Sequence, residues 1–381
     1  MNRFYLTLMA LSFASCNSGL DSYEELIDLR VLGLQAEPPE LLIDLPEAQN
    51  AAVSFKALVV DPRHGPVTYH WSFCPIASST ACLDYNDVRA LATASDAAML
   101  DGLRNATQGG TTEPVNAHSM YSPLDWWGTR AAWPYDLPAF PVTLPGTLAY
   151  YHVQDSGMGF GMGVWPSAVL DVQTGDESVK AIKRVTYGIA NRRELAQLAS
   201  ELGGEAAAAM PFELCYPEQT PATQPGCLPL KDATPNHNPM FARVRAAQGK
   251  DPTNPDWTDI ELNPAGDVAG VVTVVAGEWI RLLPEFTPES SEPYQNLKAD
   301  LVDGSLHVED LVEDIAVTWF VTSGKLLNTL TWPLFTKSLD TAYQAPDVPP
   351  ADTNGRVSVY MVARDGRGGE AWLAVEVQVV P

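Results

Sequence analysis

Apolar and polar residues alternate most regularly near the end of the sequence, between residues 356 and 380. Every second residue is apolar on both sides of the sequence DGRGG: Val357, Val359, Met361 and Ala363 precede it, and Leu373, Val375, Val377 and Val379 follow it. A period of two places such a row of side chains on one face of a strand. The segment is therefore predicted to be a β-hairpin, with Asp365 accepting hydrogen bonds from turn amides and the glycines at positive φ.

The same alternation occurs twice in the first part of the chain. Residues 53–60, VSFKALVV, and residues 67–74, VTYHWSFC, each carry apolar side chains at every second position. The sequence DPRHGP between them is dense in turn-forming residues, so we predict a second β-hairpin with one buried face. Further strands are expected at 270–283, 315–326 and 328–335.

The strand pattern predicts the fold class. A tryptophan within an early strand, followed later by a closing hairpin, is typical of an immunoglobulin-like sandwich, and Trp71 and Trp319 place this layout once in each half. A chain of 381 residues with 46% hydrophobic content can bury at least two cores, and 31 prolines and 27 glycines favour a loop-rich β protein. We expect a mainly β protein with two immunoglobulin-like β-sandwich domains.

Other stretches follow a different pattern. Residues 86–106 place apolar side chains at helical spacing, residues 122–141 are rich in aromatics and proline, and residues 191–209 form a predicted helix with Asn191 as its N-cap. They indicate a helical and aromatic insertion in the first sandwich and a short helical connector. The expected organisation is a signal peptide at 1–15, a tether at 16–24, an N-terminal sandwich at 25–185 with its insertion at about 84–145, a connector with a disulfide loop at 186–234, and a C-terminal sandwich at 235–381.

The first residues have the order of a secretory signal: Arg3, an apolar run, and two small residues before Cys16. The run of roughly ten residues would make a helix of about 15 Å, against about 30 Å of bilayer hydrocarbon, so it cannot span a membrane. The small-small-Cys ending resembles the lipobox of bacterial lipoproteins, although Phe13 stands where leucine is usual. This resemblance implies acylation of Cys16; the alternative is ordinary cleavage nearby, for example after Ala14.

The number of cysteines favours the lipid. Five cysteines are an odd set for an exported protein. With Cys16 acylated, two local pairs remain, Cys74 with Cys82 and Cys215 with Cys227, and each can close a short disulfide loop in an oxidising compartment. A zinc site is the weaker alternative, because the spacings are far from CxxC pairs.

Charge and motifs narrow the function. A net charge of −24 argues against nucleic acid and against electrostatic attachment to anionic lipid. The six histidines form no HExxH motif and the chain has no GxSxG, so we expect no enzymatic activity and no cofactor. The acidic residues between 300 and 314 leave two alternatives, a calcium site or a solvated face: Asp300, Asp303, Glu309, Asp310, Glu313 and Asp314.

Aromatic side chains gather in the predicted insertion. They are Trp126, Trp127, Trp133 and Tyr135. Such rings stack on sugars and anchor protein partners, so they are candidate ligand-binding residues; the alternative is that they form the insertion's own small core.

Several longer segments together resemble surface lipoproteins of Gram-negative bacteria that carry Ig-like or PKD-like sandwiches. The segments are LRVLGLQAEPPE, YHWSFCP, NPMF at 238–241, VTWFVTSGKL and VARDGRGGEAW, and the resemblance covers most of the chain outside about 84–145. It implies a cell-envelope location without an assigned activity. Asn17 after the cysteine resembles lipoproteins sent to the outer membrane.

These expectations lead to a functional hypothesis and an alternative. The first is a lipid-anchored envelope protein that binds a protein or glycan partner, or acts as a scaffold, through the loops of its sandwiches. The alternative is an envelope enzyme acting on polysaccharide, with Asp125 and Asp136 as its acid and base if their carboxyl groups lie about 5–9 Å apart. A purely structural spacer is a third reading.

Overall fold

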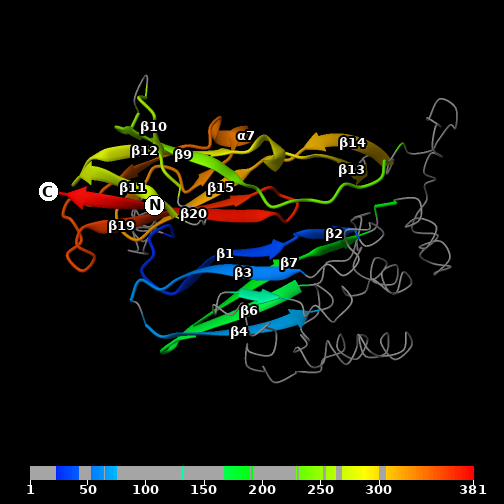
Figure 1. The fold of residues 1–381 in the computed structure, drawn as a ribbon, viewed down its shortest axis with the longest axis horizontal. Helices are drawn as coiled ribbons and strands as arrows, with labels where there is room; N and C mark the ends of the chain where they lie inside the picture. Colours follow the sequence, from blue (N-terminus) through cyan, green and yellow to red (C-terminus); the bar gives the residue numbers. More distant parts are fainter. Residues whose placement is uncertain are drawn as a thin grey trace, which may run out of the picture.

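A computed structural model shows that the protein is mainly β (Figure 1). It describes residues 23–42, 53–63, 65–74, 130–132, 167–188, 190–191, 229, 231–251, 255–262, 268–299 and 306–381. In these ranges, no helix is long and apolar enough to cross a membrane. The predicted helices at 86–106 and 192–209 and most of the predicted insertion lie outside the described residues.

Two five-stranded sheets form the C-terminal sandwich, in the orders β10-β9-β12-β18-β16 and β11-β20-β19-β15-β17. Strands β13 and β14 form a separate hairpin. The elements are β9 (Phe241–Gln248), β10 (Thr258–Ile260), β11 (Val268–Val275), β12 (Trp279–Phe286), η3 (Pro288–Ser290), β13 (Pro293–Ala299), β14 (Leu306–Val312), β15 (Ala316–Val321), β16 (Lys325–Leu326), β17 (Leu330–Thr331), α7 (Pro333–Thr336), β18 (Thr341–Gln344), β19 (Arg356–Arg364) and β20 (Glu370–Val380).

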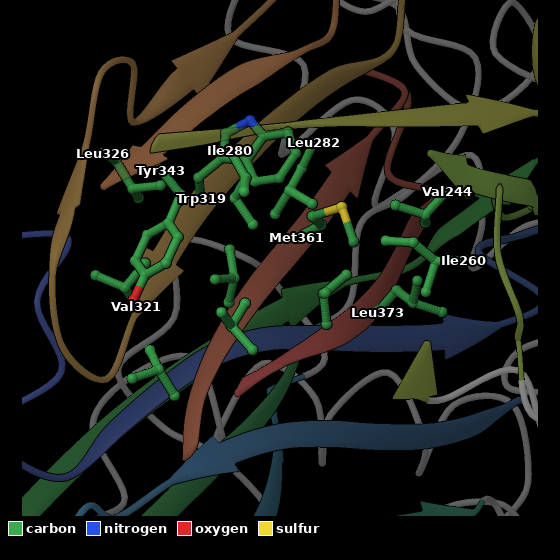
Figure 2. Close-up of a cluster of buried hydrophobic side chains, with 14 of the residues drawn as sticks. Val244, Ile260, Ile280, Leu282, Trp319, Val321, Leu326, Tyr343, Met361 and Leu373 are labelled. Atoms are coloured by element: carbon green, nitrogen blue, oxygen red, sulfur yellow. The ribbon is translucent and has the colours of Figure 1, made fainter. Parts of the chain in front are cut away.

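The core of this sandwich lies between the inner faces of the two sheets (Figure 2). Ile280 of β12 faces Trp319 of β15 and Met361 of β19, and all three are fully buried. Burial of an indole leaves its N–H in need of a partner, and Trp319 Nε1 donates to Thr331 Oγ1 at 2.8 Å. Trp319 therefore lies within a strand, as predicted, and its indole is part of the sandwich core.

The hairpin predicted between 356 and 380 is confirmed as β19 and β20. All eight apolar residues of the alternating rows are buried. Asp365 Oδ1 accepts from the backbone N–H groups of Arg367, Gly368 and Gly369 at 2.8–3.0 Å, and Gly366 and Gly368 have φ of 83° and 114°. The turn chemistry is thus as predicted.

Eight strands form the N-terminal sheets, in the orders β1-β3-β5, β4-β6-β7 and β2-β8. Phe55 of β3 and Trp71 of β4 meet between the first two sheets, with ring centroids 6.0 Å apart, and both side chains are buried. The strands are β1 (Arg30–Glu37), β2 (Glu40–Leu42), β3 (Ser54–Val60), β4 (Val67–Cys74), β5 (Arg130–Ala132), β6 (Ser167–Thr174), β7 (Glu177–Arg184) and β8 (Thr186–Gly188).

The prediction that 53–60 and 67–74 pair as a hairpin is wrong. Both are strands, but β3 pairs with β1 and β5, whereas β4 pairs with β6. The turn between them is tied to another element: Asp61 accepts from the N–H groups of Arg63 and Gly65 at 3.0 Å and from Thr174 Oγ1 at 3.3 Å. The chain therefore leaves one sheet and enters the other at the end of β6.

Three further strand predictions need correction. The segment 315–326 contains two strands, β15 and β16, which belong to different sheets, with Gly324 at φ 102° between them. The segment 270–283 contains two strands, because a turn with Gly277 at φ 78° separates β11 from β12 and sends them to different sheets. The segment 328–335 is strand only at β17, because Pro333 starts the short helix α7.

Candidate functional site

The N-terminal sheets meet the C-terminal sandwich where β1 lies along β20 (Figure 1). We call this contact the joint. Its apolar part is a cluster in which Leu32 of β1 packs with Phe320 of β15 and Val362 of β19. The strands approach closely: a Cβ at Gly33 would lie 2.9 Å from Trp372 Cε3, so only glycine fits here without a shift of the indole.

Glu370 is the centre of the first polar group in the joint. Lys183 of β7 donates to Glu370 Oε2 at 3.2 Å, and the side chains are only 9% and 7% exposed. Glu370 Oε1 accepts from Leu34 N–H of β1 at 3.3 Å and from Arg364 Nη2 at 2.9 Å. Charged groups are rarely buried unless they are paired, and here both carboxylate oxygens have cationic partners.

Arg367 is the centre of the second group. Its guanidinium donates to Glu40 of β2 at 2.7 Å, to Glu313 at 2.8 Å and to Thr234 O at 3.2 Å. It also lies over the ring of Tyr294, 5.0 Å from the centroid. One arginine in the β19–β20 turn thus pairs with a carboxylate of the N-terminal sheets and with one of its own sandwich, which suits the planar fork of donors that arginine carries.

Two asparagines add hydrogen bonds between the two sides of the joint. Asn236 N–H donates to Glu40 Oε2 at 2.8 Å, and Asn236 Nδ2 donates to Asp365 at 3.1 Å. Asn238 Nδ2 donates to Ala36 O of β1 at 2.7 Å, while its Oδ1 accepts from Glu370 N–H at 2.8 Å. Each asparagine therefore bridges the two sides of the joint.

The environment of Glu313 changes its acidity. The side chain is almost fully buried, and this burial, together with the neighbouring negative charge of Asp365, raises its pKa to about 7 in spite of the N–H of Glu292 and the guanidinium of Arg367. Glu313 Oε2 accepts from Glu292 N–H at 3.2 Å. This carboxyl group thus changes its charge near neutral pH inside the joint.

The chain that enters the fold is also fixed to the C-terminal sandwich. Glu25 forms a parallel bridge with Val321 of β15. Val321 N–H donates to Glu24 O at 2.9 Å, and Leu26 N–H donates to Val321 O at 2.8 Å. The segment before β1 is therefore bonded directly to the C-terminal sandwich, which joins the two parts at a second place.

The ion pairs of the joint stabilise the contact between the N-terminal sheets and the C-terminal sandwich. Its charged groups come from β2, β7, the β14–β15 connection and the β19–β20 hairpin, and they bond to each other. Removal of one partner from a buried ion pair costs about 3–5 kcal/mol, because the other charge stays buried. Such a network favours one relative position of the two parts.

Most of the site residues predicted from the sequence lie outside the described residues. This holds for Cys16, Cys82, Cys215, Cys227, Trp126, Trp127, Trp133, Tyr135, Asp125 and Asp136. Cys74 is the last residue of β4, and its side chain is not among those described. Lipidation, the disulfide pairs and the aromatic platform therefore stay predictions.

The acidic residues after position 300 do not share one environment: Asp310 and Asp314 are exposed, as a solvated face predicts, whereas Glu313 is buried. Asp300 and Asp303 lie outside the described residues, and within those ranges no group of three or more acidic, histidine or cysteine side chains is arranged for a metal ion. A solvated face is wrong for Glu313, which is 3% exposed and bonded to Arg367.

Sequence reasoning did not find the joint, although it noted two of its segments. NPMF contains Asn238, and RDGRGG contains Asp365 and Arg367. The local signal was the density of charge and glycine around Arg367, which the hairpin turn alone accounted for. Nothing near Lys183 points to burial, since its partner Glu370 is 187 positions away.

Comparisons with known proteins add little. No family model and no curated protein match the chain. One similar solved structure is a nucleoside hydrolase-related hypothetical protein from Saccharophagus degradans that is associated with carbohydrate metabolism, with 12% identity, a TM-score of 0.21, and coverage of 38% of this chain and 26% of that one. Another is the D0-D1 domain of intimin, with 11% identity, a TM-score of 0.17, and coverage of 91% and 98%. The chain spans about a quarter of the first protein's length.

Proposed function

We propose that this chain is a lipid-anchored protein of the bacterial cell envelope that works as a binding or scaffold module. Its two sandwiches are of the immunoglobulin-like type, with an insertion in the first. The joint is the observation that carries this proposal. A scaffold has to hold its modules in one relative position, and the pairs Lys183 with Glu370 and Glu40 with Arg367 resist separation because both charges would lose buried partners.

The anchor is consistent with the entry of the chain into the fold. Six residues lie between Cys16 and Tyr23, where the described part begins, and residues 24–26 are then hydrogen-bonded to β15. An acylated Cys16 would hold the C-terminal sandwich as directly as the N-terminal sheets. Stable attachment needs two acyl chains or a second signal, and the net charge of −24 supplies no attraction to anionic lipid.

The experiment that tests the anchor is fractionation of a Cys16→Ala variant expressed in a Gram-negative host. The variant should move from the membrane to the soluble fraction, because a protein without its acyl chains loses its hold on the bilayer. Ser18→Ala, two positions away, is the matched control and should stay with the membrane. Co-sedimentation of Cys16→Ala with the membrane, as for the native chain, would show that the anchor is not a lipid on this cysteine.

A further inference from the structure

We infer that the free edge of β11 is a docking site for an extended peptide segment that carries basic side chains. The inference deepens the proposed binding role, on which it rests, by naming a surface and the chemistry of its partner. Among the described strands, the sheet order β11-β20-β19-β15-β17 gives β11 a neighbour on one side only. We call its other side, from Val271 to Val275, the β11 edge.

The backbone of the β11 edge has hydrogen-bonding groups directed away from its sheet. Ala276 N–H donates to Val380 O of β20 at 2.8 Å. The neighbouring Val379 N–H points to the other side of β20, where it donates to Gly355 O. Since the direction alternates along a strand, residues 272, 274 and 276 face β20, and the N–H and C=O groups of Val271 and Thr273 and the N–H of Val275 face outward. Val275 O accepts from Glu278 N–H at 3.0 Å in the turn that follows. Their spacing of roughly 6.6 Å is the one that an added strand matches.

The side chains of this edge are unusual for a surface. Val271 and Val275 are 57% and 49% exposed, and the strand VAGVVTVV has no charged residue. Natural edge strands are usually protected by charges, proline, bulges or a covering segment, because an open apolar edge pairs with other strands. Strand addition uses such an edge: backbone bonds provide affinity, and alternate side chains enter pockets.

A groove lies beside the edge, where β10 and β11 separate. Gly270 N–H donates to Glu261 O at 2.5 Å, so the start of β11 is still bonded to the residue that follows β10. The volume of the groove is about 460 Å³, and its wall includes Gly270 to Thr273 on one side and Asp256 with Thr258 to Glu261 on the other. An added strand on β11 would direct every second side chain toward this groove.

Charge identifies the occupant. The charged residues that line the groove within the described ranges are Asp256, Asp259 and Glu261, all acidic. Asp259 has Arg243 at 3.7 Å, so part of its charge is compensated. A lysine or arginine of the added strand would find a complementary field here, whereas a second copy of this chain would bring a net charge of −24 against it.

The test uses two fluorescein-labelled peptides with the purified full-length mature protein in detergent. Both have nine residues and are based on alternating threonine and valine. In one peptide lysines replace some of the threonines, and in the other glutamates replace the same threonines. The basic peptide should bind at least about tenfold more tightly than the acidic one, and it should slow amide hydrogen exchange at Val271 and Val275. Equal binding of the two peptides, or of neither, would overturn the inference.

Substitutions then distinguish the contribution of backbone hydrogen bonds to peptide binding from that of the acidic side chains. Thr273→Pro removes one outward N–H without touching the ladder to β20, and it should weaken the basic peptide at least about tenfold, while Thr273→Val should not. Asp256→Asn with Glu261→Gln should reduce the preference for lysine, which keeps the test open if the proline variant does not fold. Unchanged binding of the proline variant contradicts strand addition.

A third outcome concerns self-association. A dimer that dissociates on Thr273→Pro and excludes the basic peptide would assign the edge to a second copy of this chain and overturn the basic partner. Peptide binding is measured on purified protein, so its failure leaves the fractionation of Cys16→Ala unaffected, and failure of the anchor leaves the peptide result standing.

Discussion

The joint and the β11 edge depart from the usual distribution of side chains in opposite directions. The joint buries charges, with Lys183 and Glu370 less than a tenth exposed, whereas the edge exposes valines, with Val271 more than half exposed. In the joint every one of these charges has a partner from across the contact. At the edge, no strand of the described ranges pairs with the outer side of β11. The joint is therefore a completed interface, whereas the edge is an incomplete one.

The largest effect is expected from breaking the buried pair. Lys183→Met should lower the free energy of unfolding by about 3–5 kcal/mol, since Glu370 keeps its burial and loses its most buried cation. The measurement is urea denaturation followed by tryptophan fluorescence.

Lys180→Met provides the matched control, because Lys180 lies on the same strand and also pairs with a carboxylate, Asp171, at 3.3 Å, but is 60% exposed. Its effect should stay within about 0–1 kcal/mol. Thr273→Lys at the β11 edge should change stability by only about 0.5 kcal/mol. Equal losses for Lys183→Met and Lys180→Met would mean that the joint does not hold its charges as described.

The next effect comes from the close approach of β1 to β20. Gly33→Ala places a methyl group 2.9 Å from Trp372 Cε3 and 3.0 Å from Glu370 Oε1, so it should destabilise the protein by about 1–3 kcal/mol through overpacking. A thermal or urea midpoint measures this loss.

Combining Gly33→Ala with Trp372→Leu tests whether the indole causes this loss of stability. In a Trp372→Leu background the same alanine has a smaller neighbour, and its cost should fall. If Gly33→Ala costs as much without the indole as with it, the steric explanation is wrong and the glycine serves the backbone instead.

The sequence could predict what depends on near neighbours. The β19–β20 hairpin was predictable because its alternation and the DGRGG turn lie within 25 residues, and the acceptor role of Asp365 follows from turn chemistry. Asp61 makes the same kind of turn bonds, yet its strands enter different sheets. Turn chemistry alone therefore does not decide which strands pair.

The joint was not predictable because it depends on contacts between residues that are far apart in the sequence. Lysine and glutamate are the residue types least often buried, so their default place is the surface. Their burial at Lys183 and Glu370 follows from a contact between strands separated by 187 positions. The β11 edge was hidden differently: its valines fit a buried strand by pattern, and only the sheet order shows that one side is open.

The smallest expected effect is the pH dependence of stability that comes from Glu313 in the joint. Glu313 has a pKa of about 7 in the folded protein against 4.5 in the unfolded chain. Between these pH values the folded state binds a proton that the unfolded state has released, so the contribution of Glu313 to stability is complete below pH 4.5 and is lost as pH rises through 7.

Glu313→Gln should remove this part of the pH dependence. The native protein minus the variant should therefore differ in unfolding free energy by roughly 1 kcal/mol more at pH 5 than at pH 8, because each unit of pKa difference is worth about 1.4 kcal/mol and hydration of the joint reduces the full value. Asp310→Asn, whose side chain is 79% exposed, serves as the control and should leave the pH dependence unchanged. A difference that is the same at both pH values would mean that Glu313 is already ionised at pH 5, with Arg367 outweighing both its burial and the charge of Asp365.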